Sequence, residues 1–460
     1  MWGRLRLAGG GIFKRTALRY TSFSSRIGVS PHAGSIGAFA ILDGFFFQQL
    51  TSPFAKTEHV QYEHIENEQQ LREFCDAVSE AKYLAFDTEF VSEDTYRPHL
   101  CLIQVAADDR LAIIDPLATE DVSAFWQLLA KPGHETIVHA GREEFRFCLD
   151  AIGQRPANWF DIQIAAGFVG LEYPAAYSTL ISKLIGKNLP KGETRTDWRR
   201  RPLSDKQLEY ALQDVVYLRQ IRDILAKRLD ELNRRDWLAD ELESWLTQLE
   251  HAENTEQWRR VSGSAGLSAR KLAIVREVWR WRDSEAANRN SPPKRILRDD
   301  LIVEIAKRQT DNVQRIRSVR GMEHRHLQRH LETIAECVRR AEELPESECP
   351  RPMRKGDSSH PSLVLLGQFL STALGCICRT SELAPGLVGS VQDSRDLIAE
   401  RLGLASREAQ PPRLSQGWRA KVIGPEIDKL LRGELGLRVA DPLADQPLSL
   451  ESFDNTDSNS

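Results

Sequence analysis

The alternation of apolar and polar stretches predicts strands and helices in the chain after residue 57. Three apolar runs have the length and residue types of buried strands, at 83–91, 100–107 and 110–115, and Asp108 with Asp109 between the last two indicates a hairpin turn. Further elements are predicted in alternation: helices at 66–81, at 123–129 and from Arg142, and strands at 136–139 and 159–162. Early strands joined by a hairpin, followed by alternating strands and helices, indicate an α/β domain with a mixed sheet.

From Ser204 onward the sequence pattern is helical throughout. Ser204 and Gln207 form a capping box, and apolar residues continue at helical spacing to Leu225. Proline and serine residues interrupt the helical pattern further on and indicate domain boundaries. We therefore expect the α/β domain at 57–229, a helical connector at 230–267, an all-α domain at 268–345, a linker at 346–361 and a second all-α domain at 362–440.

The two ends of the chain have opposite charge. Residues 1–56 hold seven basic residues and one acid, whereas residues 441–460 hold five acids and no base. We expect residues 1–56 to be a disordered leader or the product of an incorrectly assigned start, with an organelle-targeting segment as the alternative. We expect residues 441–460 to be a disordered acidic tail. The net charge of the chain is −4, but residues 268–345 hold eighteen basic residues against twelve acids, which predicts a polyanionic partner for that segment.

The composition is that of a folded globular protein, with 41% hydrophobic and 28% charged residues. Its seven cysteines are scattered along the chain, which argues against a disulfide framework and favours reduced thiols. No uninterrupted apolar run reaches the roughly 18 residues that span a bilayer. We therefore expect a cytoplasmic protein with no membrane segment.

The predicted strand at 83–91 carries two acids among apolar residues. Side chains alternate along a strand, so Asp87 and Glu89 share one face. Two carboxylates buried side by side repel each other and are costly to desolvate, and Mg²⁺ or Mn²⁺ with hard oxygen ligands neutralise them well. The alternative is a pair of strand-end residues that face solvent.

Two predicted helices add further candidate groups. Tyr210 and Asp214 are four residues apart and share a helix face. Glu143 and Glu144 lie in the first turn of another helix, where acids also interact with the helix dipole. Taken alone, each pair fits an ordinary surface. Taken together, carboxylates from several elements can hold two cations at a phosphoryl-transfer site, and a phenol beside the attacking water can orient it.

These motifs and their order resemble the ribonuclease D family, part of the DEDD superfamily of 3′–5′ exonucleases with a ribonuclease H-like fold. The matching stretches are FDTEF at 86–90, HAGREE at 139–144, RTDWRRRPL at 195–203 and YALQD at 210–214. The last of these is the Y-x-x-x-D form that marks the tyrosine subgroup. Residues 268–345 resemble the HRDC domain, a helical nucleic-acid-binding module, and residues 362–440 resemble the second, more divergent HRDC-like domain of the family.

The resemblance implies an active site of four metal-binding carboxylates and one tyrosine. Asp87, Glu89, Glu144 and Asp214 would hold two divalent cations, Mg²⁺ or Mn²⁺, with Asp87 bridging both, and Tyr210 would orient or deprotonate the attacking water. One position departs from the family, whose second motif has an aspartate where this chain has Glu144. The longer side chain keeps the charge and the oxygen ligands but changes the fit of the second cation.

Basic residues indicate where phosphates of an entering strand would bind. The predicted RNA-binding residues are Lys191, Arg195, Arg199, Arg200 and Arg201 before the tyrosine helix, and Arg317 and Arg320 in the first helical domain. The alternative in both places is a charged surface that only contacts solvent. The spacing gives no base-reading pattern, so we expect contacts with the RNA backbone.

The sequence therefore predicts a metal-dependent 3′–5′ exoribonuclease that releases 5′-mononucleotides and, by the resemblance, trims the 3′ ends of tRNA precursors. We infer no obligate protein partner. One alternative is a 3′–5′ DNA exonuclease, because the sugar is distinguished by contacts with the 2′-hydroxyl that motifs do not reveal. The other is an inactive RNA-binding scaffold, in which Glu144 has impaired the site.

Overall fold

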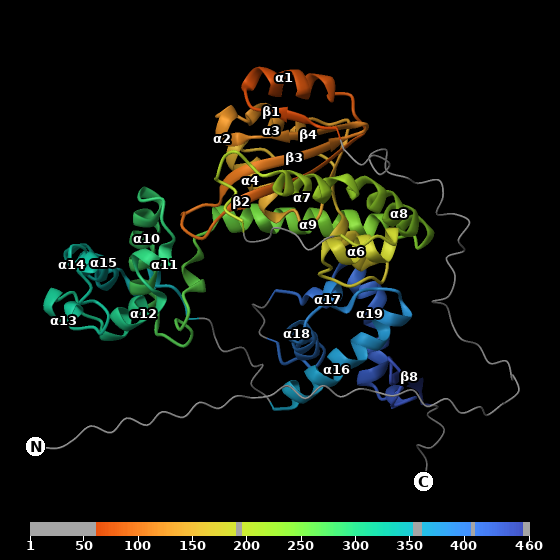
Figure 1. Cartoon of the computed structure of the whole chain (residues 1–460). Helices are drawn as coiled ribbons and strands as arrows, with labels where there is room; N and C mark the ends of the chain where they lie inside the picture. Colours follow the sequence, from red (N-terminus) through yellow and green to blue (C-terminus); the bar gives the residue numbers. More distant parts are fainter. Residues whose placement is uncertain (1–60, 190–195, 353–360, 406–409, 454–460) are drawn as a thin grey trace, which may run out of the picture. The chain divides into compact units, whose positions relative to one another are not determined.

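The computed structural model of the protein describes residues 61–189, 196–352, 361–405 and 410–453 (Figure 1). The predicted leader at 1–56, and the predicted RNA-binding residues Lys191 and Arg195, lie outside the described residues. So do residues 353–360 of the predicted linker and the last seven residues of the predicted tail.

A six-stranded mixed sheet forms the centre of the first domain. Its strands are β1 (Glu63–Ile65), β2 (Tyr83–Val91), β3 (His99–Ala107), β4 (Arg110–Ile114), β5 (Glu135–Val138) and β6 (Trp159–Asp161), in the order β1-β4-β3-β2-β5-β6. β2 pairs antiparallel with β3, and β3 with β4, while the other neighbours pair parallel. The predicted mixed sheet and its hairpin are confirmed. β1 was not predicted, because three residues are too few to show a pattern.

Helices cover both faces of this sheet. Because side chains alternate along β2, Phe86 and Thr88 point to one face, where they contact α3 (Ser123–Ala130) and α4 (Arg142–Ile152). Asp87 points to the other face, on which α7 (Asp205–Val216) packs against β2 and β3. The remaining helices of this domain are α1 (Glu68–Ala77), α2 (Pro116–Thr119), α5 (Ile162–Phe168), α6 (Tyr177–Ile185) and α8 (Leu218–Glu231).

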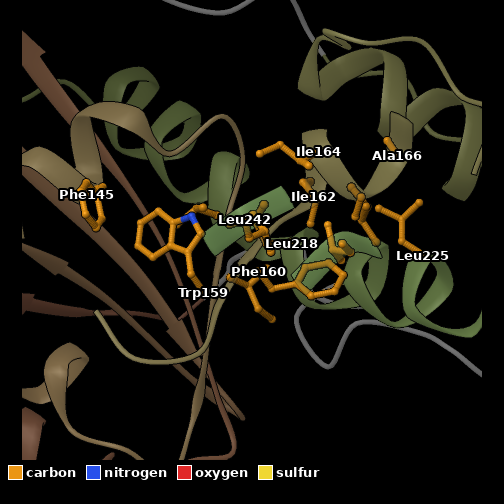
Figure 2. Packing of buried hydrophobic residues seen from close by; sticks show 14 of the residues in the cluster. Phe145, Trp159, Phe160, Ile162, Ile164, Ala166, Leu218, Leu225 and Leu242 are labelled. Carbon is orange, nitrogen blue, oxygen red and sulfur yellow. The ribbon is translucent and has the colours of Figure 1, made fainter. Parts of the chain in front are cut away.

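An aromatic core lies under the first of these faces. The Phe86 ring is fully buried and meets Phe125, Trp126 and Trp159 edge to face, at centroid distances of 5.5, 6.0 and 6.2 Å. Trp159 also meets Phe145 of α4 edge to face (Figure 2). These contacts hold α4, which carries the second sequence motif, against the sheet.

The middle of the chain is helical and has its own core. After α9 (Arg235–Asn254), the elements are η1 (Gln257–Arg260), α10 (Ala269–Asn288), α11 (Pro293–Ile296), α12 (Asp299–Arg308), α13 (Val313–Arg317), α14 (Arg325–Gln328), α15 (Leu331–Glu343) and η2 (Glu346–Glu348). Buried residues between Trp258 and Cys349 form a hydrophobic cluster of their own. The all-α prediction for this region is confirmed.

The C-terminal region is mostly helical but ends in a hairpin that the sequence did not predict. Its elements are α16 (Pro361–Thr380), α17 (Pro385–Val388), α18 (Val391–Arg401), η4 (Arg413–Ser415), α19 (Gly417–Leu431), β7 (Leu435–Val439) and β8 (Leu448–Ser452). β7 and β8 pair antiparallel, so the prediction of an all-α domain followed by a disordered tail from residue 441 is wrong here. Leu448 and Leu450 alternate with polar residues, and the Phe453 ring lies directly over Gly436. The acidic composition hid this short strand pattern.

The C-terminal region and the sheet domain share one hydrophobic core. Their buried residues form a single cluster, in which the rings of Phe168 on α5 and Trp418 on α19 lie 4.8 Å apart. Glu241 of α9 accepts two hydrogen bonds from Arg419, at 2.6 and 2.7 Å, and both side chains are almost fully buried. Because removing one partner of such a pair leaves an uncompensated charge, this contact ties the two regions together.

One helix, Ser362–Thr380, is long and apolar enough to cross a membrane by length and composition. No uninterrupted apolar run had indicated it. Nearly half of its span is buried within the protein, and its buried residues, including Leu370 and Ile377, belong to the shared core. This packing is that of a core helix.

Candidate active site

The first two carboxylates lie together on β2. Asp87 and Glu89 point to the face covered by α7, as their alternation predicted. Burial, followed by the nearby carboxylates of Glu144, Asp214 and Glu89, holds the pKa of Asp87 well above its usual range. Burial, followed by the charges of Asp214 and Glu144, raises the pKa of Glu89 to about 8. The environment therefore opposes negative charge at both positions.

The tyrosine motif lies on α7, which the predicted capping box begins. Gln207 donates its backbone N–H to the Ser204 hydroxyl, and the Gln207 side chain accepts from the Ser204 N–H, so the start of the helix is fixed. One turn apart on this helix, the Tyr210 hydroxyl donates to the Asp214 carboxylate. Burial raises the pKa of Asp214 to about 7, although the tyrosine hydrogen bond opposes this shift. Burial and the neighbouring acids also raise the pKa of Tyr210.

The structure distinguishes the two glutamates of the second motif. Glu143 is partly exposed and pairs with Arg146 at 3.3 Å. Glu144 has an exposed fraction of only 5%, and its charge is the largest electrostatic influence on Asp87. Glu144 Oε1 accepts a 2.6 Å hydrogen bond from Thr88 Oγ1, and burial raises the pKa of Glu144 to about 7. Glu144 is therefore anchored on the face of β2 that α3 and α4 cover, opposite the face to which the Asp87 side chain points.

The loop before α4 is held by a side chain that the sequence did not single out. Asp161 accepts hydrogen bonds from the backbone N–H groups of Ala140 and Gly141, at 3.1 and 3.0 Å. Ala140 has a left-handed φ of 55°, and a Cβ at Gly141 would lie 2.5 Å from Val138 and 2.6 Å from Trp159. Asp161 thus fixes the entry into α4. No local pattern reveals this role, because its partners lie twenty residues away.

Aromatic groups that sequence reasoning missed enclose the site. The Tyr177 hydroxyl donates to the backbone carbonyl of Gln213 at 3.3 Å. Burial, then the charges of Asp214 and Asp87, holds the Tyr177 pKa far above its usual range. The His139 ring lies 5.5 Å from the Tyr177 ring. The Trp198 ring lies 6.2 Å from the Tyr210 ring. The sequence analysis recognised the motif that contains Trp198 but did not predict this contact.

The four carboxylates fit a pair of divalent cations by their chemistry. They come from β2, α4 and α7, and burial raises the pKa of each. Repulsion by the charges of Glu144 and Asp214 raises the pKa of Asp87 and Glu89 further. Bound cations remove such repulsion, and clustered oxygen ligands suit Mg²⁺ or Mn²⁺. Among the described residues, no three His, Cys, Asp or Glu side chains already stand in a metal-coordinating arrangement. Cation binding would therefore require these side chains to move closer together.

Of the predicted RNA-binding arginines before α7 that the structure describes, two have close partners within the protein. Arg199 pairs with Asp94 and Asp197, both at 2.8 Å. Arg201 makes a bidentate pair with the buried Asp115, at 2.5 and 2.7 Å. Arg200 is different, since 84% of its side chain is exposed and its Nε lies as far as 3.9 Å from the Asp197 carboxylate. Arg201 therefore holds the loop in place, and Arg200 is the better candidate for phosphate contact.

The two predicted arginines of the first helical domain lie at its surface. Arg317, at the end of α13, and Arg320, just after it, are exposed, and so are Arg325 and Arg329 near α14. Lys307 and Arg320 also line a surface pocket beside α12. A basic surface of this kind suits a polyanion.

The chain matches two known families in the regions just described. Residues 62–230 match the 3′–5′ exonuclease family, and residues 271–338 match the HRDC domain. The first stretch contains all four carboxylates and the tyrosine, and the second contains the basic surface of α13.

Similar proteins cover most of the chain. A ribonuclease D of Gluconacetobacter diazotrophicus is 33% identical over 360 residues, covering 78% of this chain and 89% of the relative. A ribonuclease D of Pseudomonas paraeruginosa is 32% identical, covering 79% and 96%. The crystal structure of Escherichia coli RNase D, described as an exoribonuclease involved in structured RNA processing, superposes with a TM-score of 0.70 at 26% identity, covering 81% of this chain and 99% of that one.

Proposed function

The chain belongs to the ribonuclease D family, and on that premise we propose that it trims the 3′ ends of tRNA precursors, using two divalent cations, Mg²⁺ or Mn²⁺. The family relationship makes the chain a 3′–5′ exoribonuclease that acts on RNA. The tRNA precursor, the identity of the cations and the role of each residue are the parts that we propose.

The proposal rests on a cluster of four carboxylates, of which Glu144 is buried and the other three are half-buried. Asp87, Glu89, Glu144 and Asp214 would hold the cations, with Asp87 bridging them. Bound there, the cations would stabilise charge on the phosphodiester and make a water molecule more nucleophilic. This cluster carries the proposal because its negative charge is unfavourable in the protein without a positive counterpart.

The protein's own residues orient the reaction. The Tyr210 hydroxyl donates a hydrogen bond to Asp214, so the lone pairs of its oxygen remain available to accept a hydrogen bond from the attacking water. Its raised pKa keeps the phenol protonated near neutral pH, so we assign Tyr210 to orienting the water. The water oxygen attacks the terminal phosphorus in line, the bond from phosphorus to the O3′ of the preceding nucleotide breaks, and a nucleoside 5′-monophosphate leaves an RNA shortened by one residue.

We also propose that the chain acts in the cytoplasm with reduced thiols. All seven cysteines are free and buried. Burial raises the pKa of Cys148 and of Cys378 to about 12, which keeps these thiols protonated and unreactive.

One assay separates this proposal from its alternatives. The full chain is incubated with 3′-extended tRNA and with single-stranded DNA of the same sequence, each with Mg²⁺, Mn²⁺ or EDTA. We expect 5′-monophosphates from the tRNA with either metal and none with EDTA. Equal degradation of DNA would favour the DNA exonuclease, and tight RNA binding without degradation would favour the scaffold.

A further inference from the structure

A fully buried amide lies beside the carboxylate cluster. Gln104, in the middle of β3, is directly opposite Asp87 on β2 and opposite Ile113 on β4. Residues directly opposite in an antiparallel pair point to the same face, with Cβ atoms about 4.5–5.5 Å apart. The Gln104 side chain therefore lies on the Asp87 face, beneath α7, and its exposed fraction is 0%.

This amide has no hydrogen-bonding partner in the described part of the protein. Both Gln104 Nε2 and Gln104 Oε1 are buried and unpaired. An unpaired buried amide is unfavourable, because it has lost its hydrogen bonds with water. Its neighbours on the same face of β3, Leu102 and Ala106, are apolar and buried, so packing within the strand does not require a glutamine here. Its donor and acceptor are available to the neighbouring site.

We propose that Gln104 is a positioning residue for Asp87. Its Nε2 donates a hydrogen bond to the Asp87 carboxylate, and this holds that carboxylate in one orientation towards the position that the cations would take. The inference rests on the proposed function, since it assigns Asp87 to the cations. It adds a role for a residue that touches neither the RNA nor the metal.

Two features of the site make this hydrogen bond useful. The Thr88 backbone N–H lowers the pKa of Asp87 only slightly against the causes that raise it, so a donor from β3 would hold the carboxylate from the strand directly beside β2. In addition, a neutral N–H donor offsets part of the repulsion that Glu144, Asp214 and Glu89 exert on Asp87, without competing with the cations as a positively charged side chain would.

The test uses the full chain with Gln104→Met, which keeps the size of the side chain but removes the donor, and Gln104→Leu as a second variant. Each is compared with the wild type for melting temperature, for the rise in melting temperature caused by Mn²⁺ in the absence of RNA, and for kcat and KM on a short RNA. Ile103→Val serves as the matched control, because its side chain is also buried in β3 but points to the opposite face.

We expect both Gln104 variants to melt at or above the wild-type temperature in EDTA, because an unpaired amide has been removed. We expect the Mn²⁺-induced rise to shrink, kcat to fall about tenfold or more, and KM to stay within about twofold. Ile103→Val should melt lower and keep the wild-type Mn²⁺ response and kcat.

Three outcomes would overturn the proposal. One is a wild-type Mn²⁺ response and kcat in a folded Gln104→Met protein. Another is failure of both Gln104 variants to fold, which would assign the amide to the sheet. The third is an equal loss of kcat in Ile103→Val. Failure of the proposed function is distinguishable, because the wild type itself would then show no Mn²⁺-induced rise and no release of 5′-monophosphates.

Discussion

The buried carboxylates should make the stability of the cation-free protein fall as pH rises. The pKa of Glu89 is raised to about 8, and those of Glu144 and Asp214 to about 7. A carboxyl group whose pKa is higher in the folded chain than in the unfolded chain binds more protons when folded. It therefore contributes stability below the unfolded value, near pH 4, and that contribution is lost as pH rises towards the folded value.

The size of this effect follows from proton linkage. Each proton retained only by the folded chain lowers the free energy of unfolding by about 1.4 kcal/mol for every unit that pH rises. Because the four groups repel one another and share protons, we count one retained proton between pH 5 and pH 7, or about 3 kcal/mol. In a domain of roughly 150–250 residues, a loss of stability of that size lowers the melting temperature by about 5–10 °C.

The measurement is thermal unfolding of the full chain from pH 5 to pH 8, in EDTA and in Mn²⁺ or Mg²⁺. The cations should cancel most of the fall, because they stabilise the ionised carboxylates. His134 acts in the opposite direction, since burial lowers its pKa and its contribution grows as pH rises. Comparison with Glu89→Gln separates the contribution of Glu89 from that of His134, because both proteins contain the histidine. In EDTA the variant should show a shallower fall of melting temperature with pH, and it should melt higher than the wild type at pH 8. Equal slopes in the two proteins would refute the reasoning, as would a metal-insensitive wild type.

Three further predictions follow from the site and from the shared core. Asp87→Asn should reduce kcat by more than a hundredfold while leaving RNA affinity in a filter-binding assay unchanged, and a loss below tenfold would contradict its bridging role. Glu144→Ala should abolish turnover, whereas Glu143→Ala should keep it, and the opposite ranking of these two variants would assign Glu143 to the metals. Glu144→Asp should improve the rate with Mg²⁺ relative to the rate with Mn²⁺. Glu241→Gln leaves Arg419 buried without its partner and should cost about 3–5 kcal/mol, seen as a melting temperature lower by about 10 °C.

Local patterns in the sequence were sufficient to place the catalytic motifs. Strand alternation put Asp87 and Glu89 on one face, and the capping box at Ser204 set the start of the helix that carries Tyr210 and Asp214. These features depend on residues within a few positions of one another, so periodicity and capping chemistry reveal them.

Other features depend on partners that are distant in sequence. Asp161 supports the loop before α4, and Tyr177 approaches Asp214, only after the parallel strands and helices have assembled. Arg201 was predicted to contact RNA because it lies in a basic run, but the fold pairs it with Asp115, which directly follows β4. The unpaired amide of Gln104 was equally invisible, since on the sequence it is one polar residue within an apolar strand.

The products formed from one labelled RNA show whether the chain removes nucleotides from the 3′ end in a metal-dependent reaction. A tRNA precursor with a 3′ extension and a 5′ label is incubated with the full chain in Mg²⁺ or Mn²⁺, and products are resolved over time. We expect a ladder that shortens from the 3′ end one residue at a time, with nucleoside 5′-monophosphates released, and no ladder in EDTA or with Asp87→Asn. Internal cleavage fragments, nucleoside 3′-monophosphates, or an unchanged ladder in EDTA would contradict this expectation.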